Sequence, residues 1–135
     1  MVLEQDRPVK QVLVVRKDLN MRKGKIAAQA AHASLKVFLD RKLRTPLSDE
    51  IFSFSLTEPM ELWLKGSFTK VCLYVKSEDE LEAVHKKALK AGIPTVMIVD
   101  SGKTEFHGAL TKTVVAIGPD YCDKIDPITE GLKLF

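Results

Sequence analysis

The chain alternates between short apolar runs and longer stretches with helical spacing of apolar residues. Short runs rich in β-branched residues predict buried strands at residues 10–16, 70–75, 95–99 and 111–117. Longer segments rich in helix formers predict helices at residues 22–40, 59–64 and 78–91, with a short helical segment after residue 119. This alternation predicts an α/β fold with helices on both faces of a largely parallel sheet.

Residues at the segment boundaries support these assignments. Asn20 is the expected N-cap of the first helix, and Ser77 with Glu80 forms a capping-box pattern before the third. Gly66 and Gly92 are expected to end helices. Trp63 is expected to anchor the core, the apolar residues 132–135 to pack back onto the domain, and residues 41–54 have no clear pattern.

Length and composition limit the class of protein. A chain of 135 residues supports one packed core, so we expect a single domain over residues 1–135. Its apolar runs are too short for a membrane span, and residues 1–9 do not resemble a secretory signal. We therefore expect a cytoplasmic protein with no membrane partner. Cys72 and Cys122 show no metal-ligand spacing, which predicts reduced, structural thiols.

Positive charge is concentrated in the first third of the chain. The net charge is +3, yet residues 1–45 hold eleven Lys or Arg against four Asp or Glu. Clustered basic residues favour a polyanionic partner, because backbone phosphates attract them. A solvated basic helix face explains the same charge pattern equally simply.

Two polar segments are candidates for chemistry. In the first, Lys25, Gln29 and His32 share one face of the predicted helix, although a polar stripe can also simply face water. The second follows a predicted strand, and its acid, Asp100, precedes Thr104 and Thr113. A carboxylate beside hydroxyls and a lysine can orient water and stabilise an oxyanion, whereas the alternative is a turn in which Asp100 and Thr104 cap local backbone.

Nucleotide-cofactor motifs are missing from the sequence. Gly24 and Lys25 lack the upstream glycine of a Walker loop, and Ile26 stands where Ser or Thr is required. No G-x-G-x-x-G fingerprint occurs. We expect no cofactor and no metal.

Three motifs resemble those of the second, archaeal and eukaryotic type of peptidyl-tRNA hydrolase family. They are VVRKDLNMRKGKIAAQAAHAS, IVDSGKTEFHG and TKTVVAIGP, in the family's order and near its usual spacing. The resemblance implies a three-layer α/β/α sandwich with a four-stranded mixed sheet, one strand antiparallel, and frequent homodimers. It also implies metal-free hydrolysis of the ester bond of peptidyl-tRNA. The EFHG turn and one extra residue before the later threonine depart from the family pattern.

Carried over by position, the resemblance places the family's functional residues in these segments. Lys25, Asp100, Thr104 and Thr113 take the catalytic positions, with His32 and Gln29 in the same helix motif. The resulting hypothesis is that Asp100 positions or deprotonates a water, Lys25 stabilises the oxyanion or tunes Asp100, and Thr104 orients one of them. His32 is a secondary candidate for proton transfer, and Gln29 is expected to bind substrate.

Basic residues around the first segment are the candidates for holding tRNA phosphates. They are Arg16, Lys17, Arg22 and Lys23, followed by Lys36, Arg41, Lys42 and Arg44. Two alternatives remain at this point: a non-catalytic tRNA- or RNA-binding module of the same fold, and a protein-interaction domain that uses Phe52, Phe54 or Trp63 as an exposed surface.

Overall fold

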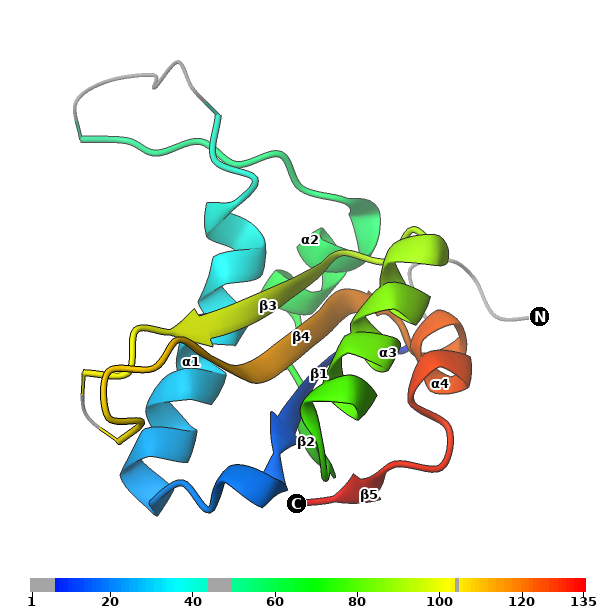
Figure 1. Cartoon of the computed structure of the whole chain (residues 1–135). Helices are drawn as coiled ribbons and strands as arrows, with labels where there is room; N and C mark the ends of the chain where they lie inside the picture. The colour runs from blue at the N-terminus through cyan, green and yellow to red at the C-terminus, as the bar shows by residue number, and fades with distance from the viewer. Residues whose placement is uncertain (1–6, 44–49, 104) are drawn as a thin grey trace.

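The computed structural model describes residues 7–43, 50–103 and 105–135, which form an α/β fold with one mixed sheet and four helices. Figure 1 shows these elements in chain order. The strands are β1 (Val9–Arg16), β2 (Lys70–Val75), β3 (Thr95–Asp100), β4 (Thr111–Tyr121) and β5 (Lys133–Leu134). The helices are α1 (Lys23–Leu39), α2 (Glu58–Lys65), α3 (Glu78–Lys90) and α4 (Cys122–Thr129), and a 3₁₀ turn, η2 (Lys17–Leu19), precedes α1.

The sheet has five strands in the order β3-β4-β1-β2-β5. β1 and β2 are parallel, β4 is antiparallel to both β1 and β3, and β5 is antiparallel to β2. The sheet is mixed, as expected, and among its four longer strands β4 alone runs against the others. The expected count of four strands is wrong because it misses β5, and the expectation of a largely parallel sheet is wrong because only β1 and β2 form a parallel pair. The apolar end of the chain adds a fifth strand, since Leu134 pairs with Leu73 at the edge of β2.

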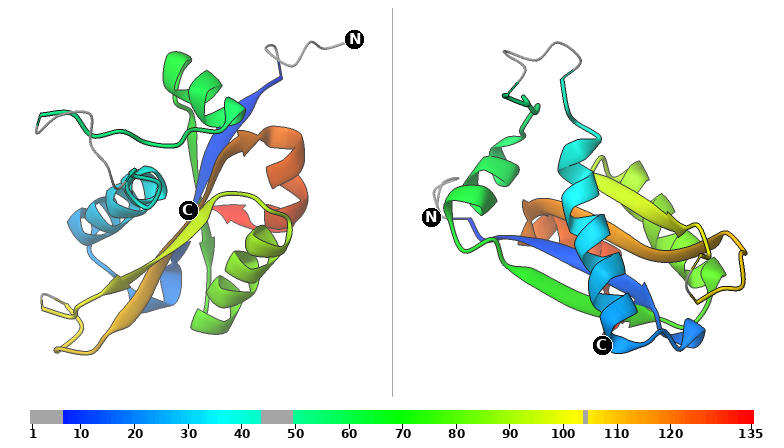
Figure 2. Two further views of the ribbon diagram at one scale, coloured as in Figure 1. Left: turned by 90° about the horizontal axis from the view of Figure 1, so that it is seen from above. Right: turned by 90° about the vertical axis from the view of Figure 1, so that its left-hand side faces the viewer.

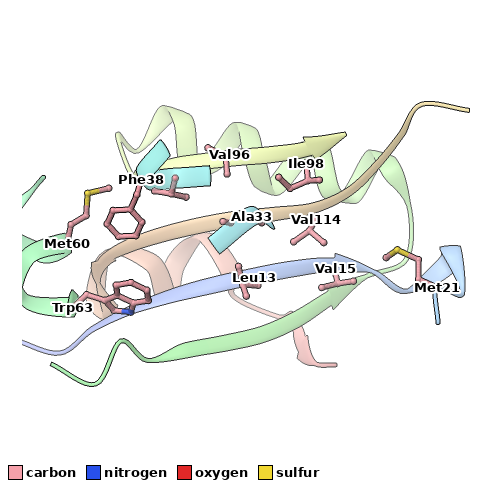
Figure 3. Packing of buried hydrophobic residues seen from close by; sticks show 12 residues of the cluster. Leu13, Val15, Met21, Ala33, Phe38, Met60, Trp63, Val96, Ile98 and Val114 are labelled. Carbon is pink, nitrogen blue, oxygen red and sulfur yellow. The ribbon is translucent and has the colours of Figure 1, made fainter. Parts of the chain in front are cut away.

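Each face of the sheet carries its own apolar core. Successive side chains of β1 point to opposite faces, so Leu13 and Val15 pack with α1 and α2 while Val12 and Val14 pack with α3 and α4. Figure 2 shows helices on either side of the sheet, and Figure 3 shows the first cluster, in which Trp63 lies beside Phe38. Both faces of the sheet are thereby removed from water, which stabilises the fold.

Most local boundary signals are confirmed. Ser77 caps α3 by accepting a hydrogen bond from the backbone N–H of Glu80, and Gly66 ends α2. Asn20 is not the N-cap of α1: it ends η2 in the left-handed conformation, with φ 51°. Arg22 occupies the N-cap position of α1 and makes no side-chain cap. Asn tolerates left-handed backbone better than most residues, so it suits the sharp turn between η2 and α1.

The aromatic side chains proposed as an interaction surface differ in their exposure. Trp63 is buried at 5% exposure, so it belongs to the core and not to an exposed interaction surface, whereas Phe52 is 65% exposed. In the part of residues 41–54 that the structure describes, Lys42 and Phe54 form an isolated antiparallel bridge; Arg44 lies outside the described residues. No helix among the described residues is long and apolar enough to cross a membrane.

Candidate active site

The two polar segments meet at one end of the sheet. α1 packs against β3 and β4, so Lys25 and Gln29, one helical turn apart, face the end of β3 and the start of β4. β3 ends at Asp100, as the sequence predicts, and Thr113 lies near the start of β4. Residues 71 or more positions apart in the chain thus become neighbours in the fold.

Asp100 and Lys25 form an ion pair that is largely shielded from water. The Lys25 Nζ to Asp100 Oδ1 distance is 2.9 Å, and the two side chains are 13% and 11% exposed. Gln29 Nε2 also donates to Oδ1, at 3.2 Å, and the backbone N–H of Gly102 donates to Oδ2, at 2.9 Å. A carboxylate has about four acceptor positions. The three described donors therefore fix its orientation and leave acceptor capacity on Oδ2.

Gln29 links the ion pair to Thr113. Thr113 is fully buried and its Oγ1 donates to Gln29 Oε1 at 2.6 Å, while Gln29 itself is 3% exposed. Since a carboxylate can only accept, the Gln29 amide nitrogen must face Asp100 and its oxygen must face Thr113. Each member of this chain holds the next in place, which restricts the rotation of Asp100.

These contacts favour the charged form of Asp100. The hydrogen bond from Lys25 is the largest of the effects that lower the pKa of the Asp100 carboxyl. Partial burial acts in the opposite direction, and the Gly102 N–H, the Lys25 charge and Gln29 lower the pKa further. Asp100 is therefore an anion at neutral pH.

Gly102 is required by the loop that follows β3. Its φ is +81°, and a Cβ at this position would lie 2.4 Å from the backbone oxygen of Ala109. The motif IVDSGKTEFHG contains this glycine, but its role as a donor to Asp100 was not predicted. The acid two residues before a glycine was the available signal, because Asp side chains commonly accept from the N–H two residues on. Asp100 therefore caps the local backbone, as the alternative expected, and also belongs to the candidate site.

The remaining candidates are distributed differently. Thr104 lies outside the described residues. His32 is exposed on α1 and makes no hydrogen bond or ion pair with any described residue. The structure thus brings together Lys25, Gln29, Asp100 and Thr113, and not His32.

The basic candidates also differ in their surroundings. Arg16 is 12% exposed and donates to the Asp18 carboxylate and the Lys112 carbonyl oxygen, while the Lys17 ammonium lies 4.4 Å from the centre of the Tyr74 ring. Arg22 is 91% exposed, and Lys23 is also exposed. Arg22 and Lys23 are thus accessible cations at the start of α1.

An α/β domain with a shielded carboxylate–ammonium pair beside strand ends has the parts of a hydrolytic enzyme. Comparison with known proteins agrees with this class. The family model "Peptidyl-tRNA hydrolase PTH2" matches residues 9–135. The chain therefore belongs to the PTH2 family of peptidyl-tRNA hydrolases.

Curated relatives are similar over most of their length. A peptidyl-tRNA hydrolase of Methanocaldococcus jannaschii is 40% identical over 93% of this chain and 99% of its own. One of Aeropyrum pernix is 42% identical over 93% and 95%. Among solved structures, a protein of unknown function from Agrobacterium tumefaciens matches with a TM-score of 0.52 at 13% identity, over 94% of this chain and 97% of its own. That last likeness concerns the fold alone.

Proposed function

We infer that this chain hydrolyses the ester bond that joins a peptide to tRNA, releasing free peptide and tRNA. Membership of the PTH2 family supports the reaction. The observation that carries the assignment of the site is the shielded pair of Lys25 and Asp100, 2.9 Å apart at the end of β3. Ester hydrolysis requires a group that orients and deprotonates water and a group that stabilises negative charge on the carbonyl oxygen. A fixed anion provides the first function and a fixed cation provides the second.

Asp100 orients the attacking water. Acceptor capacity on Oδ2 and the fixed carboxylate plane support this role. Because its pKa is lowered, Asp100 is a weak base toward water itself. It receives the proton only as the water oxygen bonds to the carbonyl carbon and becomes acidic, and the proton then passes to the departing ribose oxygen. Lys25 stabilises the negative charge that develops on the carbonyl oxygen.

Gln29 and Thr113 act as positioning residues in this proposal. Both are buried and both use their side-chain polar groups on one another or on Asp100, which supports an indirect role over contact with substrate. Thr104 remains the candidate for orienting water or Asp100, on the strength of the family pattern. His32 remains a candidate for proton transfer on the family pattern alone.

The activity is tested by peptide release from an N-acetylated aminoacyl-tRNA, in the presence of a chelator. Asp100→Asn keeps the shape of the side chain and removes its charge, and we expect kcat/KM to fall by about a hundred- to ten-thousandfold. Asp79→Asn, which changes an exposed acid in the first turn of α3, serves as the matched control and should retain activity. A wild-type protein that binds tRNA but releases no peptide would instead favour a non-catalytic RNA-binding module.

Phosphate contacts from Arg22 and Lys23 are proposed to hold the tRNA. Their exposure and their place at the positive end of α1 support this role. Binding of tRNA should weaken steeply with added salt, because each phosphate contact releases counterions. In a titration of Kd against salt, the double variant Arg22→Ala with Lys23→Ala should have a shallower slope than wild type, and Lys90→Ala, an exposed change at the end of α3, should not. Affinity that is indifferent to salt would contradict the phosphate contacts.

A homodimeric, cytoplasmic enzyme with the family's three-layer architecture is also proposed, from the family resemblance. The exposed side chains of Leu35, Leu64 and Phe68, at 57%, 48% and 57%, supply apolar surface for an interface. The molecular mass in solution tests this point, and a monomer at micromolar concentration would contradict the dimer.

A further inference from the structure

A hollow lies beside the proposed active site, between the turn after β1 and the loop that joins β3 to β4. Its volume is about 440 Å³, within the range of small-ligand sites. The residues that line it are Leu19, Asn20, Arg22, Glu105, Phe106 and His107. Apart from Arg22, which is proposed to contact tRNA phosphates, none of these residues has a role in the proposed function. Two segments nearly ninety positions apart contribute to the hollow.

Backbone hydrogen bonds hold both walls of the hollow in shape. On one side, the Asn20 N–H donates to the Lys17 carbonyl at 3.2 Å, which closes the η2 turn. On the other, the Ala109 N–H donates to the Phe106 carbonyl at 2.9 Å and the Gly108 N–H donates to the Gly102 carbonyl at 2.8 Å. A site whose walls are already ordered loses less entropy when a ligand binds.

The lining combines apolar surfaces with polar edges. Leu19 and Phe106 are partly buried and pack against the core of the α1 face, so both are fixed apolar surfaces. Glu105 supplies acceptors, and Asn20 and Arg22 supply donors. Arg22 Nε lies 3.9 Å from Glu105 Oε1, although the Arg22 side chain is 91% exposed. Such a lining suits a flat ring that has hydrogen-bonding groups on its edge.

The hollow is adjacent to the reacting groups. The centre of the Phe106 ring lies 5.7 Å from Lys25 Nζ, and Lys25 is bonded to Asp100. In peptidyl-tRNA, two groups flank the ester at this range: the terminal nucleoside on one side and the side chain of the last amino acid on the other. Amino-acid side chains vary between substrates, whereas the terminal nucleoside is always adenosine.

We propose that this hollow binds the adenine base of the terminal adenosine to which the peptide is esterified. The base stacks on Phe106, its amino group donates to Glu105, and Arg22 at the rim contacts the adjoining phosphate. This proposal rests on the proposed function and extends it to a substrate subsite. Binding of the adenine base would hold the one constant neighbour of the ester beside Asp100, whatever peptide is attached.

The test compares N-acetylated aminoacyl-tRNA ending in adenosine with the same tRNA ending in a ribose that lacks a base. For wild type, kcat/KM should be about ten- to hundredfold higher with the base, the range expected for base–aromatic stacking. Phe106→Leu keeps an apolar side chain against the core and should reduce this preference to about threefold or less. Leu110→Ala, an exposed change in the same loop and outside the hollow, should keep the full preference.

A second variant, Glu105→Gln, tests the contact with the adenine amino group. It should weaken only the preference for adenosine over a terminal purine riboside, which lacks the amino group. Thermal unfolding checks that each variant is folded. Equal turnover of the two original substrates by active wild type would overturn the subsite and leave the hydrolase intact. An unchanged base preference in Phe106→Leu, accompanied by altered selectivity for the amino-acid side chain, would assign the hollow to that side chain. Failure of wild type to release peptide from the adenosine substrate would overturn both proposals.

Discussion

Two buried glutamines on the α1 face of the sheet have a similar degree of burial but different kinds of partner. Gln11 is fully buried on β1 and donates to the carbonyl oxygens of Ser34 and Gly118, at 3.2 and 3.1 Å, while the Ser34 hydroxyl donates to Gln11 Oε1. Gln29 is 3% exposed and is equally well satisfied. Burial and hydrogen bonding therefore do not distinguish them.

The difference lies in what each amide holds. Gln11 joins α1, β1 and β4 through neutral partners, at the point where the register between β1 and β4 shifts. Gln29 donates to the Asp100 carboxylate, which also accepts a hydrogen bond from Lys25 and keeps a small exposed fraction. A buried polar group whose partner is a charged side chain with some remaining exposure is thus the better candidate for function.

Among the variants that test this comparison of the two glutamines, Lys25→Met is expected to have the largest effect, because it removes the ammonium that donates to the same carboxylate as Gln29. We expect kcat/KM to fall by about a hundred- to thousandfold, as for loss of an oxyanion-stabilising group. The pKa of Asp100 should rise, because the main cause of its lowered value is lost. Carboxyl NMR titration measures this directly.

The sign of the associated stability change follows from the same pKa. A lowered folded-state pKa means that Asp100 stabilises the fold above its unfolded pKa, and that this contribution disappears as pH falls through the folded value. In Lys25→Met the gap between the folded and unfolded pKa of Asp100 narrows, so this acid-dependent loss should be smaller than in wild type and should be complete at a higher pH. An Asp100 titration curve that did not move would contradict the assigned cause.

Gln29→Met should lower activity by about tenfold or more, because Asp100 loses an orienting donor. The unfolding free energy should also fall by about 1–3 kcal/mol, since the buried Thr113 hydroxyl loses its partner. Peptide release measured well below the melting temperature separates the two effects. Full activity in a folded variant would show that Gln29 is not needed to position Asp100 for catalysis.

Gln11→Met is the matched control for Gln29→Met. It leaves the Gly118 carbonyl without its side-chain donor and should cost about 1–3 kcal/mol of unfolding free energy in urea denaturation. Its kcat/KM should stay within about twofold of wild type under folding conditions, because Gln11 holds no charged group of the site. A large loss of activity here would show that the two glutamines do not differ as proposed.

His32→Ala should have the smallest effect. His32 lies on the same helix as Gln29 but is exposed and unbonded among the described residues. Both kcat/KM and stability should change little, with stability within about 0.5 kcal/mol. If the variant lost a limb that the wild-type pH–rate profile shows, His32 would again be a candidate for proton transfer.

Much of the local structure could be predicted because it depends on neighbouring residues. The β2 strand has the predicted bounds, Lys70–Val75, and Ser77 caps α3 as its spacing to Glu80 indicates. Asn20 was placed wrongly because the same residue type favours both N-caps and left-handed turns. The count of four strands was wrong because β5, Lys133–Leu134, is too short to show an alternating pattern. The expectation of a largely parallel sheet was wrong because an apolar strand has the same pattern in a parallel or an antiparallel pair.

The sequence alone determined the strand and helix segments, the apolar residues of the core and the candidate residues Lys25 and Asp100, because side-chain periodicity and residue chemistry are local properties. Only the tertiary structure decided that β4 lies between β1 and β3 and that Gln29 holds Asp100. It also decided that Arg16 is largely buried in local contacts while Arg22 is exposed. These outcomes depend on residues far apart in the chain, whose approach is set by packing and not by spacing.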